Sequence, residues 1–387
     1  MTFVNHYVTD LHIHIGRTRS NAAVKITAAS SLTLENIIHY AEHVKGIDVI
    51  GVIDSHVGEI LDQIEEQIRS GEAYERAEGG IQFSNVTLLL GTEIEIYDEN
   101  CHGPIHVLAY LPTLENMRAF SNWLSKRMKN ATLSSQRIYE KAVTIQEKVR
   151  ELEGLFVPAH IFTPFKSLYG KGVISSLTEV LQPSLIDAVE LGLSSDTAMA
   201  VQVIELQSYP FLTNSDAHSL EKMAREYQMI QMKEPSFSEL RLALKEVDGR
   251  KIVANYGLDP LLGKYYQTIC ASCSQPMTGR RCLICHSESI IKGVSERIKE
   301  LSLGHSKVCR PSYVHQIPLE FIPKVGRKTL NRLRAAFGTD MNVIHNASKK
   351  ELEQVVSPKI VESIMLARTS DLVIRAGGGG TFGKIID

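Results

Sequence analysis

The motif DLHIH at residues 10–14 decides how the rest of the chain is interpreted. Side chains alternate between the two faces of a β-strand, so the imidazoles of His12 and His14 project to the same side. Two imidazoles placed in this way can chelate one metal ion. We therefore expect a strand at this motif, with metal chemistry at its end.

Short apolar runs recur along the chain beyond this motif and alternate with longer amphipathic stretches. The runs are IDVIGVID (47–54), VTLLLGTEIEIY (86–97), IHVLAYL (105–111), GLFVPAHI (154–161), IDAVEL (186–191) and FLTNSDAH (211–218). Apolar residues with helical spacing, and charges on the opposite face, mark residues 32–46 and 120–154. This alternation predicts an α/β fold, built either as a barrel or as an open sheet.

Metal-ligating side chains stand at the ends of these predicted strands. Besides the first two histidines, they are Glu93, His106, His160, Asp216 and His218. A single histidine of this kind is usually a hydrogen-bonded core or surface residue, but the joint pattern favours a multinuclear metal centre. A ligand set of imidazoles and carboxylates suits Zn²⁺, Mn²⁺ or Fe²⁺ better than Ca²⁺, which prefers sites made only of oxygen atoms. Such a centre can activate water against phosphate esters without a protein nucleophile.

Composition and charge narrow the class of protein. The 387 residues are 43% hydrophobic and 22% charged, a composition typical of a globular protein. No apolar run is long enough to cross a membrane, and the start of the sequence has no signal-peptide pattern, so we expect a cytoplasmic protein. Residues 1–263 carry 23 basic and 34 acidic side chains, a net charge of −11. Residues 264–387 carry 19 and 10, a net charge of +9. A basic segment on an acidic body favours a polyanionic partner, with nucleic acid the leading candidate.

Four of the six cysteines form one motif, CASCSQPMTGRRCLIC at residues 270–285. Two residues separate Cys270 from Cys273, and two separate Cys282 from Cys285. Paired thiolates at this spacing can hold one tetrahedral Zn²⁺, and a redox dithiol is the alternative. Because four protein ligands leave no open coordination position, we expect a structural zinc that supports folding.

The order of these motifs resembles a known superfamily. DLHIH is followed by GVIDSH (51–56), GTEIEI (91–96), IHVLAY (105–110), VPAHIFTPF (157–165) and NSDAH (214–218). This order resembles the polymerase-and-histidinol-phosphatase (PHP) superfamily of metallophosphoesterases, whose fold is a distorted (β/α)7 barrel. The longer segments PAHIFTPFKSLYG (158–170) and VELGLSSDTAMA (189–200), the cysteine pairs and the helical tail resemble endonuclease Q, a family of DNA repair nucleases. The likeness runs from residue 6 to near the C-terminus.

The resemblance implies metal-binding roles for the motif residues. His12, His14, Glu93 and Asp216 would bind one ion, and Glu93 would bridge to a second. By the same resemblance, the remaining ligands are His106 and His160 at the second ion, and His218 with Asp54 or His56 at a third. The centre would hold two or three divalent ions of Zn, Mn, Fe or Mg, with Glu93, His160 and Asp216 as the catalytic residues.

Several residues are candidates for contacts with DNA. Lys166 and Lys171, or alternatively Arg17 and Arg19, would steady phosphate oxygens, unless they are only solvated loop charges. The tail segment IPKVGRKTLNRLRAAFG (322–338) resembles a helix-hairpin-helix element, in which Gly326 allows close approach to a phosphate and Lys328 and Arg332 supply charge. A basic amphipathic helix that only caps the barrel is the alternative.

The sequence also contains two weaker patterns. The segment QIPLEF (316–321) roughly fits a Gln-x-x-Leu-x-Phe sliding-clamp peptide, a pattern that often recurs by chance. Tyr169, in the loop after His160, is a candidate for stacking on an extruded base, with packing inside the loop as the alternative.

These expectations combine into one functional hypothesis. We expect a PHP catalytic domain at 1–259, a four-cysteine zinc domain at 260–304 and a helical DNA-binding domain at 305–387. The resemblance implies a metal-dependent DNA repair endonuclease, associated with the nucleoid when bound to DNA. It would nick DNA 5′ of deaminated bases (uracil, hypoxanthine, xanthine) and at abasic sites. A small-molecule phosphoesterase and a non-catalytic DNA-binding protein are the alternatives.

Overall fold

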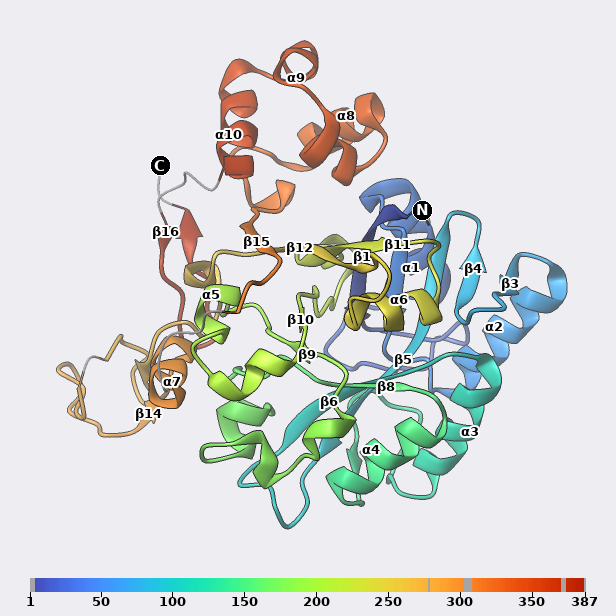
Figure 1. Cartoon of the computed structure of the whole chain (residues 1–387). Helices are drawn as coiled ribbons and strands as arrows, with labels where there is room; N and C mark the ends of the chain where they lie inside the picture. Colours follow the sequence, from blue (N-terminus) through green and yellow to red (C-terminus); the bar gives the residue numbers. More distant parts are fainter. Residues whose placement is uncertain (1–3, 278, 303–307, 370–373, 386–387) are drawn as a thin grey trace.

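Strand β1 (Asn5–Ile13), which carries the DLHIH motif, lies inside a mixed sheet of eleven strands. The computed structural model describes residues 4–277, 279–302, 308–369 and 374–385. Figure 1 shows the sheet at the centre of the molecule, with the C-terminal helices above it and the cysteine-rich segment to its left. The mixed α/β class expected from the sequence is confirmed.

The main path through the sheet follows the order β15, β12, β11, β1, β2, β5, β4 and β3. Three strands lie off this path: β6 and β7 both pair with β5, and β8 pairs with β6. These strands are β2 (Val49–Val52), β3 (Ala73–Glu75), β4 (Ile81–Phe83), β5 (Val86–Ile96), β6 (Ile105–Leu111), β7 (Arg137–Ile138), β8 (Leu155–Pro158), β11 (Tyr227–Met232), β12 (Lys251–Gly257) and β15 (Ser312–His315). Strands β1, β2 and β5 run parallel, whereas β5, β6 and β8 are antiparallel neighbours. The short connection at residues 97–104 explains the antiparallel β5–β6 pair, because a parallel crossover needs a dozen residues or more.

The hydrogen bonding continues beyond β8 to a smaller pair, β9 (Val189–Glu190) and β10 (Phe211–Leu212). The Ile161 amide donates to the Glu190 carbonyl at 2.9 Å, which joins the segment after β8 to β9. One apolar cluster takes buried side chains from most of these strands, including Leu11, Leu108 and Leu212. This shared core holds the strand ends in fixed positions relative to one another.

Helices cover the outside of this sheet. The helices of the first 302 residues are α1 (Leu34–Tyr40), α2 (Gly58–Ser70), α3 (Leu114–Ser125), α4 (Ala142–Glu151), α5 (Thr197–Ala200), α6 (Phe237–Leu244) and α7 (Val294–Leu301). Short 3-10 or π turns are η1 (Ala41–Lys45), η2 (Leu168–Gly172), η3 (Leu177–Glu179), η4 (Pro183–Leu185), η5 (Ile204–Ser208), η6 (Leu220–Lys222), η7 (Pro260–Leu262), η8 (Leu319–Phe321) and η9 (Asn342–Asn346). Threonine side chains cap α1 and α3, where Thr33 and Thr113 accept from the amide of the third residue after each of them.

The helical pattern predicted over residues 120–154 is not continuous. Helix α3 ends at Ser125 and α4 begins at Ala142. The residues between them form a loop that includes β7, and its KNATLSS sequence is rich in residues that favour turns over helices. This loop brings Ser134 and Ser135 to the ends of the strands.

The C-terminal region contains a second apolar cluster. Buried side chains from α8 (Arg327–Phe337), α9 (Lys349–Val355) and α10 (Pro358–Thr369) form most of this cluster. The other elements of the region are β13 (Ile269–Cys270), β14 (Ile290–Ile291), β16 (Ile374–Arg375) and β17 (Lys384–Ile385). Buried Lys45 of η1 pairs with buried Asp340 after α8, with Nζ 3.1 Å from Oδ2, so the tail is tied to the first part of the chain.

The clamp-like segment at 316–321 belongs to this cluster. Ile317 and Leu319 are buried in it, and Gln316 accepts a hydrogen bond from the Tyr227 hydroxyl. These side chains face the interior in this structure, and clamp binding by the segment stays a prediction. No helix in the described ranges is both long and apolar enough to span a bilayer.

Candidate metal centre

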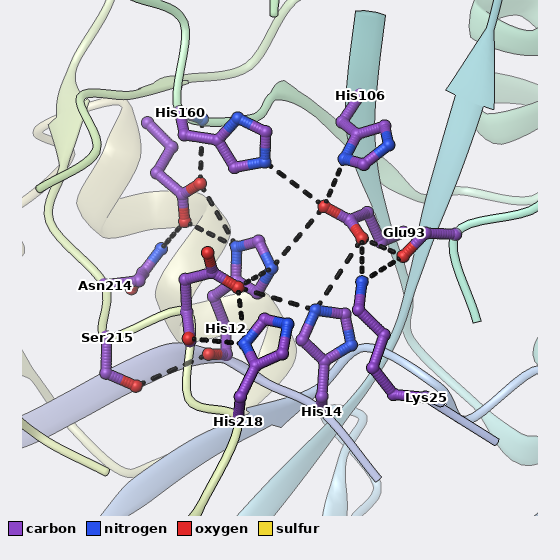
Figure 2. A network of polar contacts seen from close by, with 12 residues as sticks. His12, His14, Lys25, Glu93, His106, His160, Asn214, Ser215 and His218 are labelled. Carbon is purple, nitrogen blue, oxygen red and sulfur yellow. Dashed lines mark hydrogen bonds and ion pairs between the residues drawn. The ribbon is translucent and has the colours of Figure 1, made fainter. Parts of the chain in front are cut away.

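Histidine and carboxylate side chains from five strands, or from the residues that follow them, converge on one point. His12 lies in β1 and His14 directly after it, Glu93 lies in β5 and His106 in β6. His160 follows β8, and Asp216 and His218 follow β10. Figure 2 shows the five histidines and Glu93 facing one another around the centre. The structure therefore brings seven predicted residues together.

Two groups in this centre have the geometry of metal sites. His12, His14 and Asp216 offer ligand atoms that lie within 4.8 Å of one another, and so do Glu93, His106 and His160. The groups adjoin through the Glu93 carboxylate, whose Oε1 lies 3.8 Å from His12 Nε2 and whose Oε2 lies 3.7 Å from His14 Nε2. This position suits a carboxylate that bridges two ions.

Buried imidazole nitrogens without a hydrogen bond indicate whether the residues of this centre fit a metal ion. His12 Nε2 and His14 Nε2 are buried and make no hydrogen bond among the described residues, and the Glu93 and Asp216 carboxylates lie 3.5 to 3.8 Å from them. A buried imidazole nitrogen without a partner loses free energy unless something replaces its hydration. Divalent ions would satisfy these nitrogens, so the residues fit a metal centre.

Carboxylates behind the first two histidines fix their orientation. Glu190 lies 2.9 Å from His12 Nδ1, and Asp54 lies 3.1 Å from His14 Nδ1. Each pair leaves Nε2 as the nitrogen that faces the centre, an arrangement typical of metal-binding histidines. Asn214 in turn donates to Glu190 at 2.8 Å.

The electrostatics of the centre favour cations. Burial lowers the pKa of His12, but Glu190 and Asp216 oppose this effect and raise it to about 10. Burial raises the pKa of Asp216, yet His12 and the neighbouring imidazoles hold it well below the usual range. These buried carboxylates therefore stay ionised and provide the negative potential that attracts a divalent ion.

The backbone is strained where two of these residues lie. His160 and Asp216 have φ angles of 31° and 45°, in the left-handed region that non-glycine residues rarely adopt. The neighbouring Gly192 allows this, because a Cβ atom there would lie 2.9 Å from the His160 Cβ. Arg225 supports the other side by donating to the carbonyls of Ser215 and Asp216 at 2.7 and 3.1 Å.

The candidates for a third metal site lie in different environments. His218 Nδ1 is 3.5 Å from Asp216 Oδ1, and burial lowers its pKa to about 4, so its ring is neutral near the other ligands. Asp54 stands behind His14 and also accepts from the Ile15 amide. His56 pairs Nδ1 with Thr92 Oγ1 at 2.8 Å. Among the described residues, neither Asp54 nor His56 belongs to a metal-type group.

Three contributors were missed by the sequence analysis. Lys25 Nζ lies 3.1 Å from Glu93 Oε2 and 2.6 Å from Ser135 Oγ. Both residues come from loops, where no periodic signal marks a functional side chain. Glu190 stands at the end of a predicted strand, so the reasoning used for Glu93 would have found it.

Two cavities meet at the metal centre, and His160, Asp216 and His218 line both of them. The first, of about 380 Å³, is also lined by Lys25 and Lys166. Lys166 Nζ lies 2.7 Å from Glu95 Oε2, within reach of the same space. The second cavity, of about 650 Å³, is also lined by Glu190 and Lys264.

Lys171 and Tyr169 lie farther from the metal-binding groups. Lys171 is exposed and lines a separate cavity of about 510 Å³, which Phe165 shares with the first one. Tyr169 is fully buried, stacks on Phe162 and donates to Glu205 at 2.8 Å. The suggestion that Tyr169 stacks on a base is therefore wrong, and the packing alternative holds.

The four cysteines of the predicted zinc motif also come together. Cys270 Sγ lies 3.4 Å from Cys285 Sγ, and Cys273 Sγ lies 3.5 Å from Cys282 Sγ. All four sulfur atoms lie within 4.8 Å of one another. Four thiolates so close together match a tetrahedral metal site.

The basic helix predicted in the tail is α8. Gly326 is its N-cap residue, and open space surrounds the position of a Cβ there. Lys328 is exposed in the first turn, whereas the Arg332 guanidinium donates to the Val355 carbonyl. The first turn is thus accessible to a phosphate, while Arg332 also helps to hold α8 against α9.

Comparison with known proteins places the chain among its relatives. No family model matches it. The uncharacterized protein YqxK of Bacillus subtilis (strain 168) is 58% identical over 379 residues, which cover 97% of this chain and 98% of the relative. The crystal structure of the lesion-specific endonuclease PfuEndoQ from Pyrococcus furiosus has a TM-score of 0.85 and 31% identity, covering 98% of this chain and 95% of that one.

A second solved structure is equally similar. It is Endonuclease Q in complex with a 27-mer duplex substrate that has an abasic lesion at the active site. The TM-score is 0.84 at 30% identity, over 98% of this chain and 96% of that chain. The likeness therefore includes the metal centre, the cysteine segment and the helical tail. The chain belongs to the endonuclease Q family of DNA endonucleases.

Proposed function

We propose that this protein is a repair endonuclease that nicks one strand of DNA on the 5′ side of a damaged base. The observation that carries the proposal is the pair of adjoining His and carboxylate groups, in which the Nε2 atoms of His12 and His14 face one point and make no hydrogen bond among the described residues. The likeness to an endonuclease bound to a lesion-containing duplex extends over nearly the whole chain and supports the same substrate class.

The residues of the centre would hold two or three divalent ions of Zn, Mn, Fe or Mg. Bound there, such ions supply a hydroxide near neutral pH and neutralise charge on a phosphodiester. Glu93 would hold the two groups at a fixed distance, since its two carboxylate oxygens face different imidazoles. Glu190 and Asp54 keep the proton of each imidazole on Nδ1, which leaves Nε2 free to bind.

Lysines beside the centre would orient the phosphate. Lys25 reaches the Glu93 carboxylate from the smaller cavity, and Lys166 lies at its rim with half of its side chain exposed. Their ammonium groups can pair with the non-bridging oxygens of the phosphodiester. This contact would hold the strand in place while the reaction proceeds.

The cysteine segment and the helical tail would bind the duplex beside the metal centre. We infer a distorted (β/α)7 barrel at 1–259, a structural zinc domain at 260–304 and a helical DNA-binding domain at 305–387. The exposed N-terminus of α8, with Lys328 beside Gly326, suits contact with a phosphate irrespective of sequence.

The substrates would be bases that are easily removed from the helical stack. Uracil, hypoxanthine and xanthine form weakened pairs, and an abasic site has no pair, so extrusion of the lesion costs less than extrusion of a normal nucleotide. This difference in free energy would supply part of the selectivity.

A nicking assay tests the proposal. End-labelled duplexes with one uracil, one hypoxanthine, one abasic site or no lesion are incubated with Mg²⁺ or Mn²⁺, with Asp216→Asn as the inactive control. We expect a lesion-dependent nick on the 5′ side that the control does not make. Hydrolysis of a small phosphomonoester without any cutting of duplexes would contradict the proposal and favour a small-molecule phosphoesterase.

A further inference from the structure

The larger cavity at the metal centre has a wall that comes from the other end of the chain. Along with His160 and Asp216, the 650 Å³ cavity is lined by Tyr265, from the start of the cysteine segment, and by Phe382. Its volume lies within the range of sites that bind small molecules or single nucleotides. Phe382 therefore belongs to the surroundings of the metal centre, although it is far from it in sequence.

A glycine-rich hairpin places Phe382 in this wall. Strands β16 and β17 pair antiparallel, and the turn between them contains the glycines at 377–380. The Gly377 amide donates to the Leu261 carbonyl at 2.7 Å, and the Gly383 amide donates to the Leu262 carbonyl at 3.0 Å. A Cβ on Gly383 would lie 2.4 Å from the Leu261 carbonyl oxygen, so the close approach requires glycine. The hairpin is thus packed against η7 backbone to backbone.

The contacts of Phe382 leave part of its ring for a ligand. Phe321 meets it edge to face at a centroid distance of 6.1 Å, and the side chain is half-buried. Lys264 Nζ and Arg225 Cζ lie 4.7 and 5.9 Å from the ring centroid, and both residues line the same cavity. An aromatic face beside an ammonium group suits a flat ring that is linked to a phosphate.

We propose that Phe382, delivered by the glycine-rich C-terminal hairpin, stacks on the unpaired base that follows the phosphodiester at the metal centre. This inference rests on the proposed function. The smaller cavity, with Lys25 and Lys166, would take the sugar and phosphate upstream of the cut. The base attached just downstream then has one adjacent space, which is the cavity walled by Phe382 and Tyr265.

An abasic site distinguishes stacking from a purely structural role, because it has the sugar and phosphate but no base. We expect Phe382→Leu, which keeps an apolar side chain without an aromatic face, to cut a uracil duplex about 10-fold more slowly than wild type. Cutting of the abasic duplex should stay within about 2-fold of wild type, since no stacked base is lost. Phe382→Tyr should restore the cutting of uracil.

An aromatic side chain far from the cavities serves as the control. Tyr74→Ala removes an exposed aromatic side chain of β3 away from the cavities and should leave both substrates unaffected. Equal losses on the two duplexes, or no loss on either, would overturn the role of Phe382 while leaving the endonuclease intact. A wild-type protein that cuts the abasic duplex but no base lesion would also overturn it. If the wild type cuts neither duplex, the proposed function itself fails.

Discussion

Asp216 is the carboxylate on which the first metal-type group depends. Its Oδ1 lies 3.5 Å from both His12 Nε2 and His14 Nε2. Asp216→Asn keeps the shape of the side chain, and asparagine tolerates the left-handed backbone conformation. We predict that cutting falls by about 100-fold or more, because the charge that holds the ions is lost. Single-turnover nicking measures this.

DNA affinity provides the matched measurement for Asp216→Asn. The basic surfaces that contact phosphates are unchanged, so the dissociation constant should stay within about 3-fold of wild type. A parallel loss of cutting and binding would contradict the separation of catalysis from DNA binding.

Glu190 acts through His12, so it is a positioning residue. Glu190→Gln should lower the metal affinity by roughly 10- to 100-fold, since the imidazole loses the charge behind Nδ1. Metal content after dialysis against a buffered metal solution measures the change. Glu353→Gln, on exposed α9, is the control that should retain wild-type content. Unchanged metal content in Glu190→Gln would show that His12 is oriented without this carboxylate.

Glu226 predicts a pH dependence of stability. Burial raises its pKa to about 8, and only Oε1 has a partner among the described residues, the Leu258 amide at 2.9 Å. Because the folded pKa lies above the unfolded value near 4.5, the folded state binds the proton more tightly. The stabilising contribution is complete below about pH 4.5 and is lost as the pH rises through about 8.

Glu226→Gln removes this titration and keeps an acceptor for the amide. We expect it to be more stable than wild type by roughly 2–4 kcal/mol at pH 8.5, with a smaller difference at pH 5. Urea denaturation at both pH values measures the free energy of unfolding. A difference that is the same at both pH values would show that Glu226 is already ionised in the folded protein.

Among individual residues, the sequence identifies those site residues that lie at the ends of strands. His106 and His160 were identifiable because an apolar run precedes or follows them. Lys25 and Ser135 were not, because loops have no period that would reveal which side chains turn inward. Asp54 and His56 were alternative candidates for the third ion, and whether Asp54 binds an ion or only orients His14 depends on the direction of its carboxylate.

Helix α8 is the element best placed to contact the DNA backbone. Arg327 and Lys328 are both exposed in its first turn, next to the unobstructed Gly326. We predict that Arg327→Ala with Lys328→Ala weakens binding to all duplexes alike and lowers the slope of log affinity against log salt by about 2. Fluorescence anisotropy at several salt concentrations measures the slope.

Helix α9 offers a matched control for this prediction. Lys349 and Lys350 are exposed in its first turn, so Lys349→Ala with Lys350→Ala removes the same charge from a neighbouring helix. If both double variants lower the slope equally, the binding surface is a diffuse positive field and not the N-terminus of α8.

Elements with strong local signals were predicted well, and the ones shaped by long-range contacts were not. The apolar run at 86–97 became β5, and the basic helix at 322–338 became α8. Residues 120–154 have the spacing of one helix, but the turn-forming residues between α3 and α4 break it. The antiparallel pairing of β6 follows from the length of a connection, which periodicity does not reveal.

For the whole molecule, the buried pair of Lys45 and Asp340 predicts how unfolding proceeds. The pair joins η1 to the C-terminal helices, and Arg334 also holds Asp340. Lys45→Met should destabilise the contact by about 2–4 kcal/mol, because a buried carboxylate loses one of its partners. We expect calorimetry to show the tail melting before the sheet, whereas wild type melts in one transition.

The exposed Lys126 provides the comparison for Lys45→Met. Lys126→Met removes the same charge from the C-cap of α3 and should keep the single transition. Two transitions in the wild-type protein would mean that the tail is not stabilised by its contact with η1.

The charge difference between the two parts of the chain also acts on the whole molecule. The acidic first part gathers carboxylates where cations are needed, and the basic last part carries the charge that attracts DNA. Composition alone revealed this difference, but it did not reveal that the C-terminal hairpin returns to the metal centre, which depends on backbone contacts between Gly383 and η7.

The pairing of β1 with β11 has a consequence for synthesis of the protein. Asn5 lies opposite Met232, so one edge of the strand that carries DLHIH has no partner until residue 232 has left the ribosome. At the usual rates of translation this takes roughly 10 to 45 s. During that time the nascent chain exposes an open, apolar strand edge, of the kind that chaperones protect from aggregation. Yield during overexpression should therefore depend on chaperone capacity more than on the stability of the finished fold.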